Sequence, residues 1–186
     1  MTTLVSIDPG ISSGIVIGTF SKEQPLQIVG GSQVEGGLEG FLGFLSANDL
    51  KFPDADSPSG FGDTVYVAER FVPLAAQGFS HTAKSVEPLR VEGALVALGY
   101  MPADPTEPGW QRPSQQYWVQ GKNATEKRRR QKAWFKEHHP ELYKTGKDVG
   151  CKDAEDYWSA LFHAFAYLRG LRHEPTLRYY WPEREE

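Results

Sequence analysis

The chain has 186 residues, of which 39% are hydrophobic and 24% charged, so it is long and apolar enough to bury the core of one domain. With a formal net charge of -4, any contact with nucleic acid must come from local basic patches. The single cysteine cannot form an internal disulfide. No apolar run could cross a bilayer, and no signal pattern precedes the first strand, so we expect a cytoplasmic protein with no membrane contact.

The first predicted strand contains Leu4, Val5 and Ile7 and ends abruptly at Pro9-Gly10. Asp8 is thereby left at the end of the strand, where a carboxylate is well placed for a metal ion or a phosphate. A glycine-rich turn leads into a second strand over residues 15–18, which predicts a β-hairpin with the acid at its mouth. The alternative is that Asp8 simply opens the turn.

Residues 27–34 favour a third strand, and apolar residues at helical spacing between Leu38 and Leu45 favour a short helix. A loop is expected over residues 48–63. The fourth strand, residues 64–69, ends on Glu69, as the first ends on Asp8. Two neighbouring strands that each end in a carboxylate form a specific arrangement, although Glu69 and Arg70 could also be a plain surface pair.

A helix is predicted over residues 80–98, with a kink or a break at Pro88. We expect its packed face to contain Val86, Leu89, Gly93, Ala94 and Ala97. Four prolines between residues 102 and 113 then indicate a loop, and residues 115–119 are predicted as the fifth strand.

The segment over residues 122–136 predicts a basic helix capped at Asn123 or Thr125 and buried through Trp134 and Phe135. Its side chains are either a solvated face or a patch that contacts DNA phosphates. The candidate DNA-contacting residues of this helix are Lys122, Lys127, Arg128, Arg129 and Arg130.

The last helix is expected from about Cys151 to Gly170, with Asp153 and Asp156 three residues apart on one face. That face continues through Ala160 and either His163 or Ala164. The rest of the helix is apolar nearly all round, which predicts burial. Buried carboxylates need a cation, because an unpaired buried charge costs several kcal/mol or more. A helix-capping role is the alternative for Asp153, and it explains Asp156 less well.

The candidate catalytic and metal-binding residues are therefore Asp8, Glu69, Asp153 and Asp156. Ligands that are all oxygen suit Mg²⁺, with Mn²⁺ as a substitute, rather than zinc. Four carboxylates are enough to hold two ions about 3.5–4 Å apart, as in metal-assisted phosphodiester cleavage.

Taken in order, these motifs resemble RuvC-type Holliday junction resolvases, in particular the phage versions, within the ribonuclease H-like superfamily. The matching stretches are residues 7–10 followed by Gly14, residues 67–69 followed by an aromatic residue, and residues 153–156 at the start of an alanine-rich helix with His163. The resemblance implies an α/β fold with a five-stranded mixed sheet in the order 3-2-1-4-5, flanked by helices. It implies one nuclease domain over residues 1–170 and a C-terminal tail over residues 171–186.

By the same resemblance, Asp8 would bridge two ions, with Asp156 on the nucleophile side and Glu69 on the leaving-group side. Asp153 would assist as a ligand or a base. The family acts as a homodimer that nicks two strands of a four-way DNA junction, and the helix over residues 80–98 takes the position of its dimer element. Phe71 is the candidate aromatic wedge, but it follows Glu69 by two residues where the family has three. A phage-encoded enzyme would work in the host cytoplasm.

The expected function is thus a Mg²⁺-dependent endonuclease that resolves four-way junctions by paired nicking. One alternative is a less selective nuclease of the same fold that acts on forks, flaps or RNA–DNA hybrids. Another is a catalytically silent nucleic-acid-binding module, which would have little use for four crowded carboxylates. An actin-like ATPase is excluded because the chain is too short for its two domains.

Overall fold

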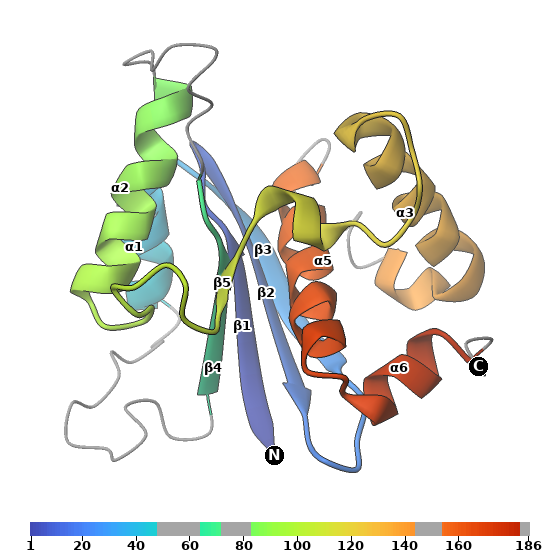
Figure 1. Ribbon diagram of the computed structural model, residues 1–186. Coiled ribbons are helices and arrows are strands. Elements are labelled where there is room, and N and C mark those ends of the chain that lie inside the picture. Colours follow the sequence, from blue (N-terminus) through green and yellow to red (C-terminus); the bar gives the residue numbers. More distant parts are fainter. Residues whose placement is uncertain (48–63, 72–82, 144–153, 183–186) are drawn as a thin grey trace.

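The computed structural model describes residues 1–47, 64–71, 83–143 and 154–182 (Figure 1). The elements, in chain order, are β1 (Thr2–Asp8), β2 (Ser12–Phe20), β3 (Gln27–Glu35), α1 (Gly37–Ala47), β4 (Thr64–Glu69), α2 (Ala83–Ala97), β5 (Trp110–Gln111), the 3-10 helix η2 (Pro113–Gln116), α3 (Ala124–His138), α5 (Glu155–Gly170) and α6 (Glu174–Tyr180). The predicted loop over residues 48–63, together with Cys151 and Asp153, lies outside the described residues.

The five strands form one mixed sheet in the order β3-β2-β1-β4-β5, which confirms the expected order. Strand β1 is antiparallel to β2 and parallel to β4, and β4 is parallel to the short edge strand β5. Ile7 pairs with Ala68 across β1 and β4. The next residue of each strand, Asp8 and Glu69, therefore ends its strand at the same edge of the sheet.

Helices cover both faces of the sheet, with α1 and α2 on one face and α5 on the other (Figure 1). Helices α3 and α6 lie outside α5 and enclose an aromatic layer around Trp118, Phe135 and Tyr180. Successive side chains of a strand point to opposite faces of the sheet, so every second residue enters the same layer. On β1, Val5 and Ile7 enter the core on the α1 and α2 side, whereas Leu4 enters the core on the α5 side.

Helix α5 packs closely against the sheet because small residues face it. A Cβ atom on Gly14 of β2 would lie 1.9 Å from the backbone oxygen of Asp156, so only glycine leaves room for the helix. The Ser6 hydroxyl of β1 donates a 2.7 Å hydrogen bond to the backbone oxygen of Ala160. The expectation of a buried last helix that presses onto the sheet through Ala160 is confirmed, since ten residues of α5 are buried.

Two expectations about the positions of elements were wrong. Residues 115–119 form no strand; β5 is Trp110–Gln111, and Pro113 then starts the helix η2. The aromatic and β-branched residues there favour a strand, but Trp118 instead packs into the aromatic layer. Helix α5 begins at Glu155, later than expected, because Ala154 has a φ of 44° and cannot continue a helix toward the N-terminus.

The packed face of α2 also differs from the expected one. Val91 and Leu95 are fully buried, whereas Leu89, Gly93 and Ala97 are exposed. The expected face therefore points to solvent over these three positions. Helix α2 runs as one element with Pro88 inside it, not as two pieces. None of the helices in the described part of the chain has the length and hydropathy needed to cross a bilayer.

Candidate active site

Three of the four predicted acidic residues lie in one region, where the ends of β1 and β4 meet the start of α5. Asp8 and Glu69 have the same parity along their strands as Leu4 and Val67, whose side chains enter the core on the α5 side. Their carboxylates therefore face α5, whose second residue is Asp156. Asp153, the fourth, lies outside the described residues.

The pKa of Asp8 responds to burial and to the neighbouring charges. Burial raises the pKa of the Asp8 carboxyl well above its usual range, and the negative charges of Glu69 and Asp156 raise it further. The positive charge of Arg128 and hydrogen bonding to Ser159 lower this pKa but do not compensate. Burial together with the two neighbouring acids therefore disfavours the ionised form of Asp8.

Asp156 lies in the first turn of α5, and its backbone N–H donates a 3.3 Å hydrogen bond to the side chain of Gln33. Burial raises the pKa of the Asp156 carboxyl, the Arg128 guanidinium lowers it, and the nearby charge of Glu35 raises it. Asp156 is thus the second residue of α5, a position at which a carboxylate is also favourable for the helix start, so the expectation that a capping role explains it less well is not supported.

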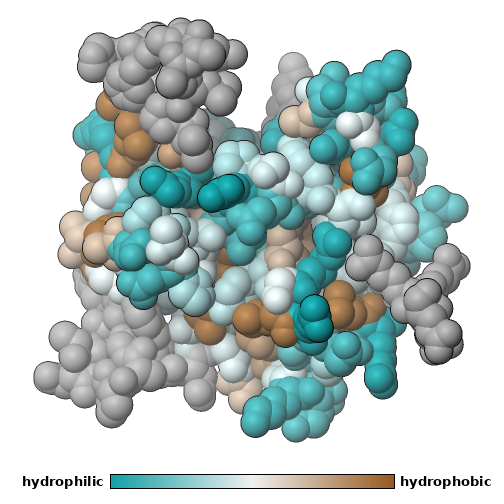
Figure 2. All heavy atoms as spheres, in the orientation of Figure 1, coloured by the Kyte–Doolittle hydropathy of each residue, from teal (hydrophilic) through white to brown (hydrophobic). Residues whose placement is uncertain are grey.

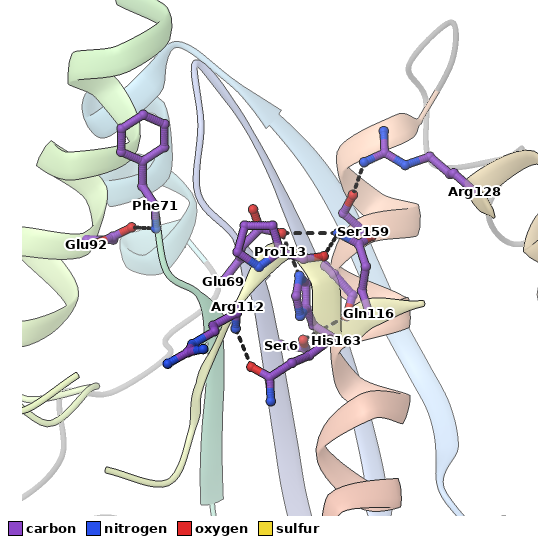
Figure 3. Close-up of polar contacts among 12 residues, drawn as sticks. Ser6, Glu69, Phe71, Glu92, Arg112, Pro113, Gln116, Arg128, Ser159 and His163 are labelled. Atoms are coloured by element: carbon purple, nitrogen blue, oxygen red, sulfur yellow. Dashed lines mark hydrogen bonds and ion pairs between the residues drawn. The ribbon is translucent and has the colours of Figure 1, made fainter. Parts of the chain in front are cut away.

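Glu69 is held by two donors from different elements (Figure 3). His163 of α5 contacts Oε2 of Glu69 through Nε2 at 2.6 Å, and the side-chain amide of Gln116 in η2 donates to the same oxygen at 3.3 Å. Sequence reasoning placed His163 on the same helix face as Asp156 but gave it no role in the site, and it missed Gln116. The spacing of seven residues from Asp156 to His163, two helical turns, was the available signal.

Arg128 reaches from α3 across to α5 (Figure 3). Its guanidinium donates to the hydroxyl of Ser159 at 2.9 Å and to the carboxylate of Glu155 at 3.1 Å. Glu155 also forms an ion pair with Lys132. Burial would raise the pKa of Glu155, but Lys132 and Arg128 bring it below its usual range. Arg128 was predicted as a DNA contact; the structure places it beside the acidic residues.

Phe71, the candidate wedge, follows β4 and is half-buried. Its backbone N–H donates to the Glu92 carboxylate of α2, and its ring points away from Glu69 (Figure 3). Burial raises the pKa of Glu92 to about 7, although the hydrogen bond from Phe71 and the charge of Arg70 lower it. Sequence reasoning missed Glu92, because it is one of several polar residues on α2 and nothing in the pattern singles it out.

The other predicted DNA-contacting residues separate into two groups around α3. Arg128 and Arg129 line a cavity of about 690 Å³ together with Lys132 and Lys136. Arg130 instead pairs with Glu126 at 2.6 Å and donates to the backbone oxygen of Gln120. Lys127 lies over the ring of Tyr117 at 5.8 Å, and Lys122 is exposed at the start of the helix.

Arg128, Lys132 and Lys136 of this cavity follow one another at intervals of four residues and share one helix face, and Arg129 adjoins Arg128. The surface over α3 is mostly hydrophilic (Figure 2).

Helix α3 is capped at Asn123, which was one of the two caps expected from the sequence. The side chain of Asn123 accepts a 2.9 Å hydrogen bond from the backbone N–H of Glu126.

The donor set fits Mg²⁺ in its chemistry, because the side chains of Asp8, Glu69 and Asp156 offer only oxygen. Within the described ranges, however, no three His, Cys, Asp or Glu side chains are grouped closely enough to hold a metal ion. His163 and Gln116 draw the carboxylate of Glu69 to one side, and Arg128 neutralises part of the charge between the other two acids.

Comparisons with known proteins give a likeness in structure but none in sequence. No family model matches the chain, and no curated protein matches it in sequence. Among solved structures, a chain of T. thermophilus RuvC in complex with Holliday junction substrate aligns over 94% of this chain and 98% of that chain, with 14% sequence identity and a TM-score of 0.48. The fold follows from the strands themselves: their order and directions are those of the ribonuclease H-like fold.

Proposed function

We propose that this protein is a Mg²⁺-dependent endonuclease that resolves four-way DNA junctions. The observation that carries the proposal is that Asp8, Glu69 and Asp156 come from three separate elements to one region, where burial raises the pKa of Asp8 and the charges of the other two acids raise it further. These three residues, with Asp153 as the fourth, are the proposed ligands. Divalent ions bound there supply an activated water and stabilise the leaving oxygen of a phosphodiester.

The chain's own residues supply the framework for this chemistry. The neighbouring strands β1 and β4 end in Asp8 and Glu69, and Asp156 in the first turn of α5 lies near enough to Asp8 for its charge to raise the pKa of Asp8. Ser159 and Arg128 contribute a hydrogen bond and positive charge at Asp8, which keep its carboxylate ionised more readily than burial alone would allow. An ionised Asp8 is the form that binds a cation.

We further propose that DNA approaches along the cavity-lining face of α3. Four cations line the cavity, and one of them, Arg128, also contacts α5 next to the acids. Phosphates bound along α3 would therefore lie near the proposed cleavage site. Lys122 and Arg130, which do not line the cavity, are outside this path.

The cleavage assay compares a synthetic four-way junction, a fork, an RNA–DNA hybrid and a linear duplex, with Mg²⁺ and with a chelator. We expect symmetric nicks in the junction, dependent on Mg²⁺ and absent in Asp8→Asn, which should still bind the junction because it places less negative charge near the phosphates. Cleavage of forks or hybrids in preference to junctions would instead support the alternative function, a less selective nuclease of the same fold. Full activity of Asp8→Asn would remove Asp8 from the mechanism.

The path along α3 is tested with two double variants of equal charge. Arg129→Ala with Lys136→Ala removes two cations from the cavity, whereas Lys122→Ala with Arg130→Ala removes two from outside it. The first pair should weaken junction binding and lower the slope of log K against log salt by about 2, since each phosphate contact contributes about 0.9. Equal losses in both pairs would contradict the path.

Paired nicking requires two active sites, so we propose a homodimer. Light scattering of the full chain should give about twice the 20.8 kDa mass of one chain. A monomer both free and bound to a junction would contradict paired nicking by this protein.

A further inference from the structure

His163 is fully buried, with an exposed fraction of 0%, and its Nε2 lies 2.6 Å from Oε2 of Glu69. A carboxylate only accepts hydrogen bonds, so the hydrogen must be on Nε2. The imidazole therefore donates to Glu69 from inside the layer between α5 and the sheet.

The other ring nitrogen, Nδ1, is buried and has no hydrogen-bond partner among the described residues. A buried polar atom without a partner costs stability, and an apolar side chain at this position would avoid that cost. Packing alone therefore does not explain a histidine here; its Nε2 contact with Glu69 does.

Both donors to Glu69 use the same oxygen. His163 and Gln116 each contact Oε2, and the part of the chain that the structure describes provides no hydrogen bond to Oε1. The side chain of Glu69 is 19% exposed, so part of it reaches solvent. Among the described residues, Oε2 is thus held by two hydrogen bonds and Oε1 by none.

We propose that His163 is a positioning residue for Glu69. Its Nε2–H fixes Oε2 so that Oε1 is presented to a divalent cation in one orientation. Donors that hold a ligating carboxylate in this way orient it and raise the affinity for the metal. The cation belongs to the proposed function, on which this part of the inference rests; the contact between His163 and Glu69 does not depend on it.

Three substitutions of His163 distinguish the role of its hydrogen-bond donor from that of the space its ring fills. In His163→Gln the amide nitrogen takes the place of Nε2, in His163→Asn it takes the place of Nδ1, and in His163→Leu no donor remains. Mn²⁺ affinity is measured for the full chain without DNA, alongside the unfolding temperature. His163→Leu and His163→Asn should lose about 10-fold or more in affinity. His163→Gln should stay within about 3-fold of wild type, and His163→Leu should unfold at the same or a higher temperature.

The same substitutions in a Glu69→Gln background should cause no further loss, because the group that His163 positions is already changed. The proposal is overturned if His163→Leu keeps wild-type Mn²⁺ affinity, or if His163→Gln loses as much as His163→Leu. Absence of Mn²⁺ binding in the wild type would instead refute the proposed function.

The contact itself is measured by nitrogen NMR of the imidazole in the metal-free protein. We expect the ring of His163 to carry its hydrogen on Nε2, and to lose this preference in Glu69→Leu. A hydrogen on Nδ1 in the wild type would overturn the inference whatever the protein binds.

Discussion

Glu92 shows how a single buried carboxyl makes stability depend on pH. Burial raises its pKa from 4.5 to about 7 in the folded protein. The unfolded chain therefore loses this proton at lower pH than the folded protein, and stability falls as the pH rises from about 4.5 to about 7. Below that range the carboxyl is protonated in both states.

Glu92→Gln should remove this dependence, because the amide stays neutral and its oxygen can still accept from Phe71. We expect the variant to match wild type at pH 4 and to exceed it by on the order of 1–2 kcal/mol at pH 8, allowing for solvent screening of a partly exposed group. Urea unfolding at several pH values measures the difference. A difference that does not change with pH would refute it.

The positions of the candidate acidic residues at the ends of elements could be predicted from the sequence. Asp8, Glu69 and Asp156 each stand at the end of a strand or the start of a helix, where local patterns are strong. The partners that hold them come from elsewhere in the chain. Gln116 and Ser159 reach the site only because η2 and α5 pack as they do, and no local pattern marks a residue whose role depends on that packing.

Among the elements, the close packing of the start of α5 against Gly14 of β2 decides whether the site forms. Gly14→Ala would place a Cβ atom 1.9 Å from the backbone oxygen of Asp156, and backbone at a packed helix start has little room to move. We expect a loss of about 3 kcal/mol or more in the free energy of unfolding, measured with urea.

Gly30→Ala is the matched control for this prediction. Gly30 lies on the neighbouring strand β3, and a Cβ atom there would meet nothing within 4 Å. Alanine restricts the unfolded chain more than glycine does, so Gly30→Ala should leave stability unchanged or raise it by about 0.5 kcal/mol. Similar losses in both variants would show that α5 does not depend on Gly14.

The strands with strong periodic patterns, β1 to β4, were predicted from the sequence, and the order of the sheet followed from the family resemblance. Strand β5 was misplaced because it has only two residues, and its pairing with Ala68 and Glu69 is a contact between distant segments. The face of α2 was also misassigned, because its small and apolar residues are spread around the helix and only tertiary packing selects Val91 and Leu95 for burial.

At the scale of the whole molecule, α6 closes the aromatic layer outside α5. Tyr180 is buried, its ring packs 4.6 Å from that of Phe165, and its hydroxyl donates to the backbone of Leu26 at 2.8 Å. The backbone of Leu26 in turn donates to Thr176 of α6. The segment after residue 170 thus joins the core to the connection between β2 and β3.

Tyr180→Ala should therefore cost about 3–5 kcal/mol of unfolding free energy, as expected for deleting a large buried aromatic side chain. Tyr179→Ala, at a neighbouring position that is 56% exposed, should change stability by no more than about 0.5 kcal/mol. Thermal and urea unfolding measure both variants. If Tyr180→Ala were as mild as Tyr179→Ala, α6 would contribute nothing to the core.

The crowding of negative charge at Asp8 is tested most directly by the unfolding temperatures of wild type and Asp8→Asn, each in chelator and in Mg²⁺. Because the pKa of Asp8 is raised, its ionised form costs stability as the pH rises above 3.8, so in chelator at pH 7 Asp8→Asn should unfold a few degrees higher than wild type. Mg²⁺ at about ten times its dissociation constant should stabilise wild type by about 1.4 kcal/mol and Asp8→Asn much less. Equal responses of the two proteins to Mg²⁺, or none in wild type, would contradict cation binding by these carboxylates.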